Sequence, residues 1–333
     1  MQCKIRLGVV LAGLAAGVMM FGSTGSAQAA TFPEKGRPIT LIVPYPAGGG
    51  TDVTARLLAP MLEKELGTPV QVVNKGGAGG QIGVTEIVRA KPDGYTIGNM
   101  ILPTVITTYL DPSRKAVFSR KSLDLLALQD NDPGIIAVKS DSPYKTLKDL
   151  IDAAKANPGK IRTTTAGILS DDHIGAMLTE KAGGVKFAIV HFAGSAPGRN
   201  AVLGGHVEVF YGNVSEMEAQ VRAGEIRLLA VMDKHRSKFY PDVKTAEEQG
   251  YKVYSGVHRG IGMPAGAPKE VKDVLAAALK KIITSDEFKT QMEKLSYAPM
   301  YMDPKTYLDF WVDYETQGQK WVDWSKESSK DVK

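Results

Sequence analysis

The sequence predicts an α/β protein with two domains, each a doubly wound sheet flanked by helices. Its 333 residues are a length typical of two domains. Short apolar runs rich in β-branched residues alternate with amphipathic segments, a pattern typical of strands and helices in a parallel sheet. Several apolar runs end in glycine-rich bends. Because ligands of doubly wound sheets bind beyond the carboxyl ends of the strands, we expect a ligand site where these bends meet.

The first strand and bend form the unit around which we expect the fold to be organised. Residues 39–43 are aliphatic and β-branched, as in a strand buried on both faces. The three glycines of residues 48–50 lack a Cβ atom, so their backbone can approach a ligand closely. Thr51 or Asp52 is placed to cap the next helix, whose first N–H groups attract a carboxylate. The spacing fits neither a P-loop nor a dinucleotide fingerprint, and a purely structural turn is the alternative.

A second unit of the same kind follows along the chain. Residues 70–74 read as a strand, and the bend of residues 75–80 contains four glycines. Two such bends at neighbouring strand ends favour a ligand site over two structural turns. A polar run at residues 130–134 is consistent with a crossing between domains. The other elements expected here are a helix at 81–90, a turn at 91–94, strands at 95–100, 123–129 and 135–139, and a less regular segment at 102–120.

The second half repeats the pattern. A strand at 161–165 leads through a small-residue loop into a helix that Ser170 or Asp171 is placed to cap. A strand at 185–192 precedes another small-residue bend at residues 193–198. The other elements expected are helices at 144–157, 199–203, 214–223, 269–284, 286–295 and 305–324, and strands at 206–211, 227–232 and 254–263.

The last predicted helix has an apolar stripe. Leu308, Trp311 and Val312 recur there at helical spacing, which indicates core packing rather than an aromatic ligand site.

The first 29 residues have the three-part pattern of a secretory signal peptide. Lys4 and Arg6 precede an uncharged apolar run at residues 7–21, and small residues then lead to an expected cleavage after Ala29. The run is too short for a membrane anchor. Cys3, the single cysteine of the sequence, leaves with the peptide. We therefore expect an exported protein without a thiol.

Composition and charge argue against several classes of partner. After two basic residues leave with the signal peptide, 39 of the 41 basic residues stand against 36 acidic ones, a net charge near +3. No dense basic block is present, which argues against nucleic acid. The mild positive excess suits an anionic small molecule.

Catalytic and metal-binding patterns are missing from the sequence. None of the five histidines stands in a His-Glu-x-x-His spacing. The bend at residues 194–198 lacks the glycines of a hydrolase elbow. Ser170, Asp171 and His173 have the residue types of a triad, but neighbours at one helix start do not converge on a substrate. We expect no enzymatic activity, no cofactor and no metal site.

The ordered motifs resemble the periplasmic solute-binding receptors of the tripartite tricarboxylate transporter family, the Bug-type receptors. The resemblance covers about residues 38–311. Its most specific segments are residues 43–56, 73–80 and 92–96, which read VPYPAGGGTDVTAR, VNKGGAGG and PDGYT. Weaker agreement is found at residues 142–150, 156–160, 203–208 and 263–266.

The resemblance implies a two-lobed fold of the Venus flytrap type that closes around a ligand. The carboxylate of this ligand would be held chiefly by backbone groups and bridging waters. The implied division is a signal peptide at 1–29, a discontinuous first domain at 30–133 and 257–324, a second domain at 134–256, and a flexible tail at 325–333. The implied ligand-binding positions are Tyr45, Ala47, Gly48, Gly49, Asp52 and Asn74 in the first domain, and Thr165, Gly167, Ser170, His173 and Glu208 in the second.

The resemblance also implies a function. We expect a monomeric periplasmic receptor that captures a small organic carboxylate, such as a di- or tricarboxylate or an aromatic acid. It would deliver this ligand to the integral-membrane subunits of a tripartite tricarboxylate-type transporter. A receptor that signals to a membrane sensor kinase and an exported hydrolase are the alternatives.

The chain departs from the family pattern at three positions near the expected site. Leu169 stands where the pattern has a second glycine, and His191 and Ala193 stand where it commonly has proline and lysine. Because Ala193 provides no cation, we expect the far end of the ligand to be less charged than a tricarboxylate.

Overall fold

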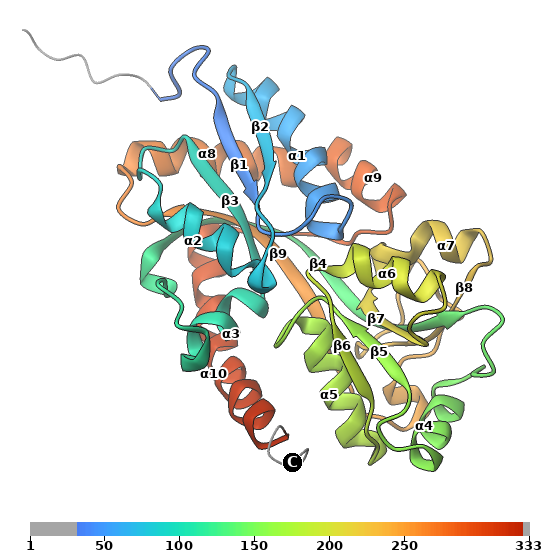
Figure 1. Cartoon of the computed structure of the whole chain (residues 1–333). Coiled ribbons are helices and arrows are strands. Elements are labelled where there is room, and N and C mark those ends of the chain that lie inside the picture. Colours follow the sequence, from blue (N-terminus) through green and yellow to red (C-terminus); the bar gives the residue numbers. More distant parts are fainter. Residues whose placement is uncertain (1–31, 329–333) are drawn as a thin grey trace, which may run out of the picture. The chain divides into compact units, whose positions relative to one another are not determined.

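The computed structural model describes residues 32–328, which form a two-lobed α/β fold with mixed sheets and flanking helices (Figure 1). This confirms the predicted fold class. The predicted signal peptide and cleavage position lie outside the described residues. None of the helices in the described part combines the length and hydropathy that a bilayer crossing requires.

The first lobe is built on a sheet with the strand order β2-β1-β3-β9-β4. The first three strands are mutually parallel, whereas β9 runs antiparallel to β3, so the sheet is mixed. Its strands are β1 (Ile39–Val43), β2 (Val70–Asn74), β3 (Thr96–Leu102), β9 (Gly256–Pro264), the first part of β4 (Leu123–Lys139) and β10 (Pro299–Met302). Its helices are α1 (Gly50–Leu66), α2 (Gln81–Arg89), α3 (Thr104–Leu110), α8 (Lys269–Ile283), α9 (Asp286–Lys294) and α10 (Pro304–Ser328).

Strand β1 is covered on both faces, as its uniformly apolar sequence predicts. Successive side chains of a strand point to opposite faces. Leu41 packs in the cluster that contains α1, α8 and α9, and Ile42 packs in the cluster that contains α2, α3 and α10. The buried strand therefore brings its carboxyl end, and the glycine bend behind it, to a defined edge of the sheet.

The second lobe is built on the other end of β4. There β4 runs antiparallel to β7 and β8, and β5 runs parallel to β6 and β7. The strands added here are β5 (Arg162–Thr165), β6 (Ala188–His191), β7 (Val209–Asn213) and β8 (Ile226–Val231). The helices are α4 (Leu147–Ala156), α5 (Asp171–Gly183), α6 (Ser195–Leu203), the short 3₁₀ helix η4 (Val214–Met217) and α7 (Glu218–Arg222).

The sequence predicts two strands separated by the polar run at residues 130–134, whereas the structure has one strand that continues through it. Strand β4 is continuous and passes from the first sheet into the second. Asp130 and Asp132 lie inside it without exposure, because Arg259 on the neighbouring β9 pairs with both carboxylates, at 3.1 and 3.0 Å. A buried cation thus compensates carboxylates that local sequence places in a loop.

The C-terminal segment differs from the prediction in three ways. Strand β10 adds to β4 where only helices are expected. Leu308 and Val312 are exposed, so the stripe predicted for α10 is wrong except at Trp311. The helix also continues through Ser328, and Val322 near its end packs in a cluster with residues of α5. The core face of α10 is made by Tyr307, Trp311 and Val322.

Candidate functional site

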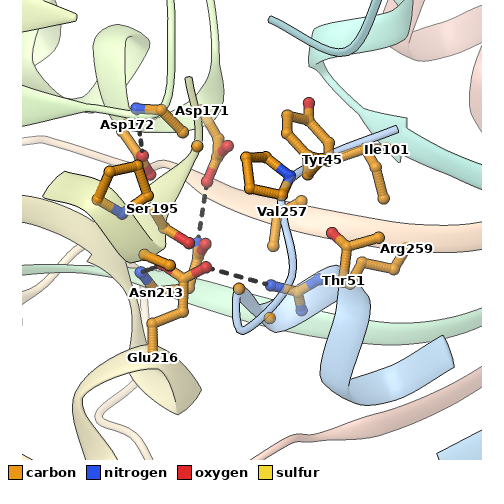
Figure 2. Close-up of a pocket in the computed structure, with 17 residues that line it drawn as sticks. Tyr45, Thr51, Ile101, Asp171, Asp172, Ser195, Asn213, Glu216, Val257 and Arg259 are labelled. Atoms are coloured by element: carbon orange, nitrogen blue, oxygen red, sulfur yellow. Dashed lines mark hydrogen bonds and ion pairs between the residues drawn. The ribbon is translucent and has the colours of Figure 1, made fainter. Parts of the chain in front are cut away.

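A small cavity lies between the bend after β1 and the loops of the second lobe, with β9 beneath it (Figure 2). Its volume is about 30 Å³. This is far below the roughly 150 Å³ of a protein cavity that holds benzene, so the two lobes are nearly closed upon each other. The cavity is lined by Tyr45, Pro46, Gly49, Gly50, Thr51 and Ile101 of the first lobe, Ala166, Asp171, Asp172, Gly194, Ser195, Ala196, Pro197, Asn213 and Glu216 of the second, and Val257 and Arg259 of β9.

Asp52 stabilises the bend after β1 and does not cap helix α1. Helix α1 has Gly49 as its N-cap and no capping side chain, so the capping role expected of Thr51 or Asp52 is wrong. The Asp52 carboxylate instead accepts a hydrogen bond from Gly48 N at 2.9 Å and one from Asn74 Nδ2 at 2.9 Å. Gly48 has φ 83°, a conformation that favours glycine. The first N–H groups of α1 are thus left without a side-chain acceptor.

Hydrogen bonds keep Asp52 ionised. Partial burial opposes this, but the bonds from Arg56, Gly48 and Asn74 hold the pKa of Asp52 below its usual value. Asn74 also donates from Nδ2 to the carbonyl of Tyr45 at 3.1 Å. Asp52 and Asn74 therefore shape the bend from behind, whereas Tyr45 and Gly49 reach the cavity.

The second-lobe loop before α5 approaches the first lobe closely. Gly167 has φ 137°, and a Cβ atom there would lie 3.4 Å from Gly79 Cα. Leu169, where the family pattern has glycine, also adopts a positive φ of 58°. Its side chain is buried and its carbonyl accepts a hydrogen bond from Thr107 Oγ1 at 2.9 Å, so packing holds a conformation that leucine disfavours. Ser170 caps α5 by accepting from His173 N, as predicted.

Glu208 does not join the other predicted positions. It precedes β7, and its carboxylate pairs with Arg162 at the start of β5, with 2.6 Å between Oε1 and Nη2. Thr165, at the other end of β5, has Oγ1 2.7 Å from Nδ1 of His191. Because the site lies at the carboxyl ends of these parallel strands, Glu208 is at the wrong end of the sheet to line the cavity.

Five charged or amide side chains of the cavity were not assigned as ligand-binding positions from the sequence. Asp171 and Asp172 open α5, Asn213 ends β7, Glu216 lies in η4, and Arg259 lies on β9. Asp171, Asp172 and Asn213 can be identified from the sequence as candidates, because each is a polar residue near a predicted helix start or strand end. The position of Glu216 depends on η4, and that of Arg259 on the antiparallel return of β9, so no local pattern identifies them.

The acidic residues of this wall are buried. Asp171, Asp172 and Glu216 are 6, 2 and 8% exposed. Asp171 accepts a hydrogen bond from Asn213 Nδ2 at 2.9 Å, and Asp172 accepts one from Ala166 N at 2.9 Å. Burial raises the pKa of Asp171 to about 6, and burial together with the Asp171 charge raises the pKa of Asp172 well above its usual value.

Arg259 is the cation shared by the buried carboxylates. Its side chain is 1% exposed and contacts Asp130 and Asp132, and its Nη2 lies 4.0 Å from Glu216 Oε1. One guanidinium cannot fully compensate three carboxylates. Burial therefore raises the pKa of Asp130 to about 7 despite the Arg259 charge.

His173 is a buried neutral histidine whose effect on stability can be measured. It is 9% exposed and its Nδ1 accepts a hydrogen bond from Leu169 N at 2.9 Å, which a protonated Nδ1 could not do. Burial, with the nearby ring of His191, lowers the pKa of His173 to about 3. Below pH 6.5 the unfolded state therefore binds a proton that the folded state does not, and stability falls as the pH falls.

Replacing His173 by asparagine, whose Oδ1 can accept the same hydrogen bond, should reduce this pH dependence. Between pH 7 and pH 5 the unmodified protein should lose about 2 kcal/mol more of its unfolding free energy than the variant. Urea unfolding at several pH values measures the difference, because the other buried groups contribute to both proteins. If the unfolding free energies of the two proteins change equally with pH, the assignment of His173 as a buried neutral group is wrong.

No group of three or more histidine, cysteine, aspartate or glutamate side chains within residues 32–328 could hold a metal ion.

Comparisons with known proteins agree on one family. The model of the tripartite tricarboxylate transporter family receptor matches residues 54–323. A UPF0065 protein from the gbd 5′ region of Cupriavidus necator is 31% identical over 303 residues, which are 89% of this chain and 90% of that protein. Protein BugT of Bordetella pertussis is 33% identical over 235 residues, 69% of this chain and 70% of that protein.

Solved structures give the same answer. The periplasmic binding protein BugD is 30% identical, with a TM-score of 0.80 over 90% of this chain and 99% of its own. Two Rhodopseudomonas palustris structures, one with adipate and one with bound malate, share the fold at 24% identity, with TM-scores of 0.83 and 0.78 over 88 and 87% of this chain and 97 and 100% of their own. The chain therefore belongs to the tripartite tricarboxylate transporter receptor family, a family of periplasmic solute-binding receptors.

Proposed function

We propose that this receptor captures a small organic carboxylate in the cavity between its lobes and delivers it to a tripartite tricarboxylate-type membrane transporter. Family membership supports the general role. The observation that carries the ligand class is a pair of helix starts that meet at the cavity. The N-caps of α1 and α6 are Gly49 and Gly194, and neither helix has a capping side chain.

The two helix starts come from different lobes and are close together. A Cβ atom on Gly49 would lie 3.3 Å from Ser195 Oγ, the first residue of α6. Uncapped first-turn N–H groups carry partial positive charge and donate to anions. Backbone donors also recognise a carboxylate without bringing in another buried charge. A ligand carboxylate between Gly49 and Ser195 would therefore connect the lobes.

Binding in this cavity requires the lobes to separate and close again. A volume of about 30 Å³ is too small for an organic acid, since a protein cavity that holds benzene has roughly 150 Å³. Strand β4 passes from the first sheet into the second and the chain returns to the first sheet at β9, so these are the connections about which the lobes would move. Arg199 Nη2 donates to Gly48 O at 3.4 Å, and Arg114 Nη1 donates to Ile168 O at 3.5 Å, so both would be released on opening.

A thermal-shift screen tests the ligand class. The protein without residues 1–29 is heated with a panel of aliphatic and aromatic mono-, di- and tricarboxylates, each paired with its uncharged amide. An acid present at about 100 times its dissociation constant should add about 2.7 kcal/mol to the free energy of unfolding, and its amide should add nothing. The proposal fails if no acid stabilises the protein, or if amides stabilise it as much as acids do. Loss of acid uptake in cells without the receptor tests the transport role.

A further inference from the structure

The wall of the cavity carries more carboxylates than cations. Asp171, Asp172 and Glu216 line it, and each is more than nine-tenths buried. Arg259 is the single cation among the lining residues that the structure describes, and it already pairs with Asp130 and Asp132. Burial and the closeness of these carboxyl groups already raise the pKa of Asp171 and Asp172, so further negative charge from a ligand is disfavoured in this wall, where repulsion between like charges is poorly screened.

A second observation is that one buried donor of Arg259, a residue that lines the cavity, lacks a partner. Nε of Arg259 has no hydrogen-bond partner within the described residues, although the side chain is 1% exposed. Its Nη2 is 4.0 Å from Glu216 Oε1, beyond hydrogen-bond distance. Figure 2 shows the guanidinium group of Arg259 beside Glu216, with Asp171 and Asp172 farther from it in the same pocket. A buried donor without an acceptor is costly, so this side of the cavity suits a ligand oxygen.

We propose that the ligand is a zwitterion, an organic acid that also carries an ammonium group, with the ammonium group bound by Asp171, Asp172 and Glu216. The inference rests on the proposed function, because the carboxylate of the same molecule binds at the starts of α1 and α6 and beside Arg259. An ammonium group donates three hydrogen bonds and relieves the repulsion within the acidic wall. An amino acid supplies an ammonium group for the acidic wall and a carboxylate for the helix starts and Arg259, whereas a dicarboxylate supplies carboxylates alone.

Matched pairs of acids that differ by one amino group test the inference. The pairs are L-aspartate and succinate, L-glutamate and glutarate, L-leucine and 4-methylpentanoate, and L-phenylalanine and 3-phenylpropanoate, with putrescine as a cation that lacks a carboxylate. Titration calorimetry should show that the amino acid of the best-binding pair binds at least about tenfold more tightly, the factor expected from one added charge-assisted hydrogen bond.

The outcomes separate this inference from the proposed function. If succinate or another acid without an amino group binds as tightly as its partner, the zwitterion is wrong and the carboxylate receptor stands. If putrescine binds as tightly as the amino acids, or if no member of any pair binds, both are wrong.

Two conservative variants test which residues cause the preference for an amino acid over its matched acid. Asp172→Asn and Glu216→Gln each replace a carboxyl group, which can be charged beside an ammonium group, by a neutral amide of the same shape, and each should reduce the preference for the amino acid to about twofold or less. The matched control is Asp152→Asn. Asp152 is an exposed residue on α4 that pairs with Lys148, so this variant makes the same carboxyl-to-amide replacement outside the cavity. It should keep the full preference. Thermal melts confirm folding, and an undiminished preference in both cavity variants would overturn the assignment of the acidic wall.

Discussion

A valine in place of Gly49 should weaken binding of the tightest acid by about 10- to 100-fold. A Cβ atom at this position lies 3.3 Å from Ser195 Oγ of the other lobe, and the two further methyl groups of valine would reach beyond it. Inserting such groups into a well-packed contact costs about 1–3 kcal/mol, and here the cost falls on the closed form. Titration calorimetry on the folded variant measures the loss.

Two further variants distinguish a steric effect between lobes from a blocked approach of the ligand to the backbone. Gly49→Ala adds the single Cβ atom, which the Ser195 hydroxyl can avoid by rotation, so binding should weaken by less than about threefold. Adding Ser195→Gly to the valine variant removes the contacted atom and should restore most of the affinity. A valine variant that binds within twofold of the original protein would contradict the placement of the ligand beside Gly49.

Replacing Arg259 by methionine should lower the free energy of unfolding by about 3–5 kcal/mol. The substitution leaves Asp130 and Asp132 buried without a counter-charge, and breaking a buried pair from one side is costly because of this residual charge. Urea unfolding at pH 7 measures the change. A loss smaller than about 1 kcal/mol would show that the three groups do not form the buried network described here.

Matched controls identify the cause of that loss. Arg162→Met removes an arginine whose pair with Glu208 is largely exposed, and it should have no measurable effect. Combining Arg259→Met with Asp130→Asn and Asp132→Asn removes the charges together and should recover most of the lost stability, since buried ion pairs contribute little net stability over neutral residues. If the triple variant is no more stable than Arg259→Met, lost packing rather than lost charge is the cause.

Elements with a local pattern were predictable, and elements made by distant partners were not. The uniform apolar run of β1 identifies a strand buried on both faces, and Ser170 is a recognisable helix cap. Strand β4 was predicted as two strands because a run with two aspartates reads as a loop. It continues because Arg259, 129 residues from Asp130, compensates them. Glu208 lies away from the cavity, a placement that a family motif does not reveal, since a motif shows where a residue stands in the chain and not which end of a strand borders the cavity.

By itself, the sequence determined the α/β class, the order of most strands and helices, and the glycine bends at the strand ends, because all of these depend on the periodicity and turn chemistry of neighbouring residues. Only the tertiary structure decided which side chains surround the cavity. It brought Asp171, Glu216 and Arg259 together from α5, η4 and β9, and so gave a site expected to bind an anion a largely acidic wall. The physical reason is that burial and charge balance depend on contacts between segments far apart in the chain, which no local pattern encodes.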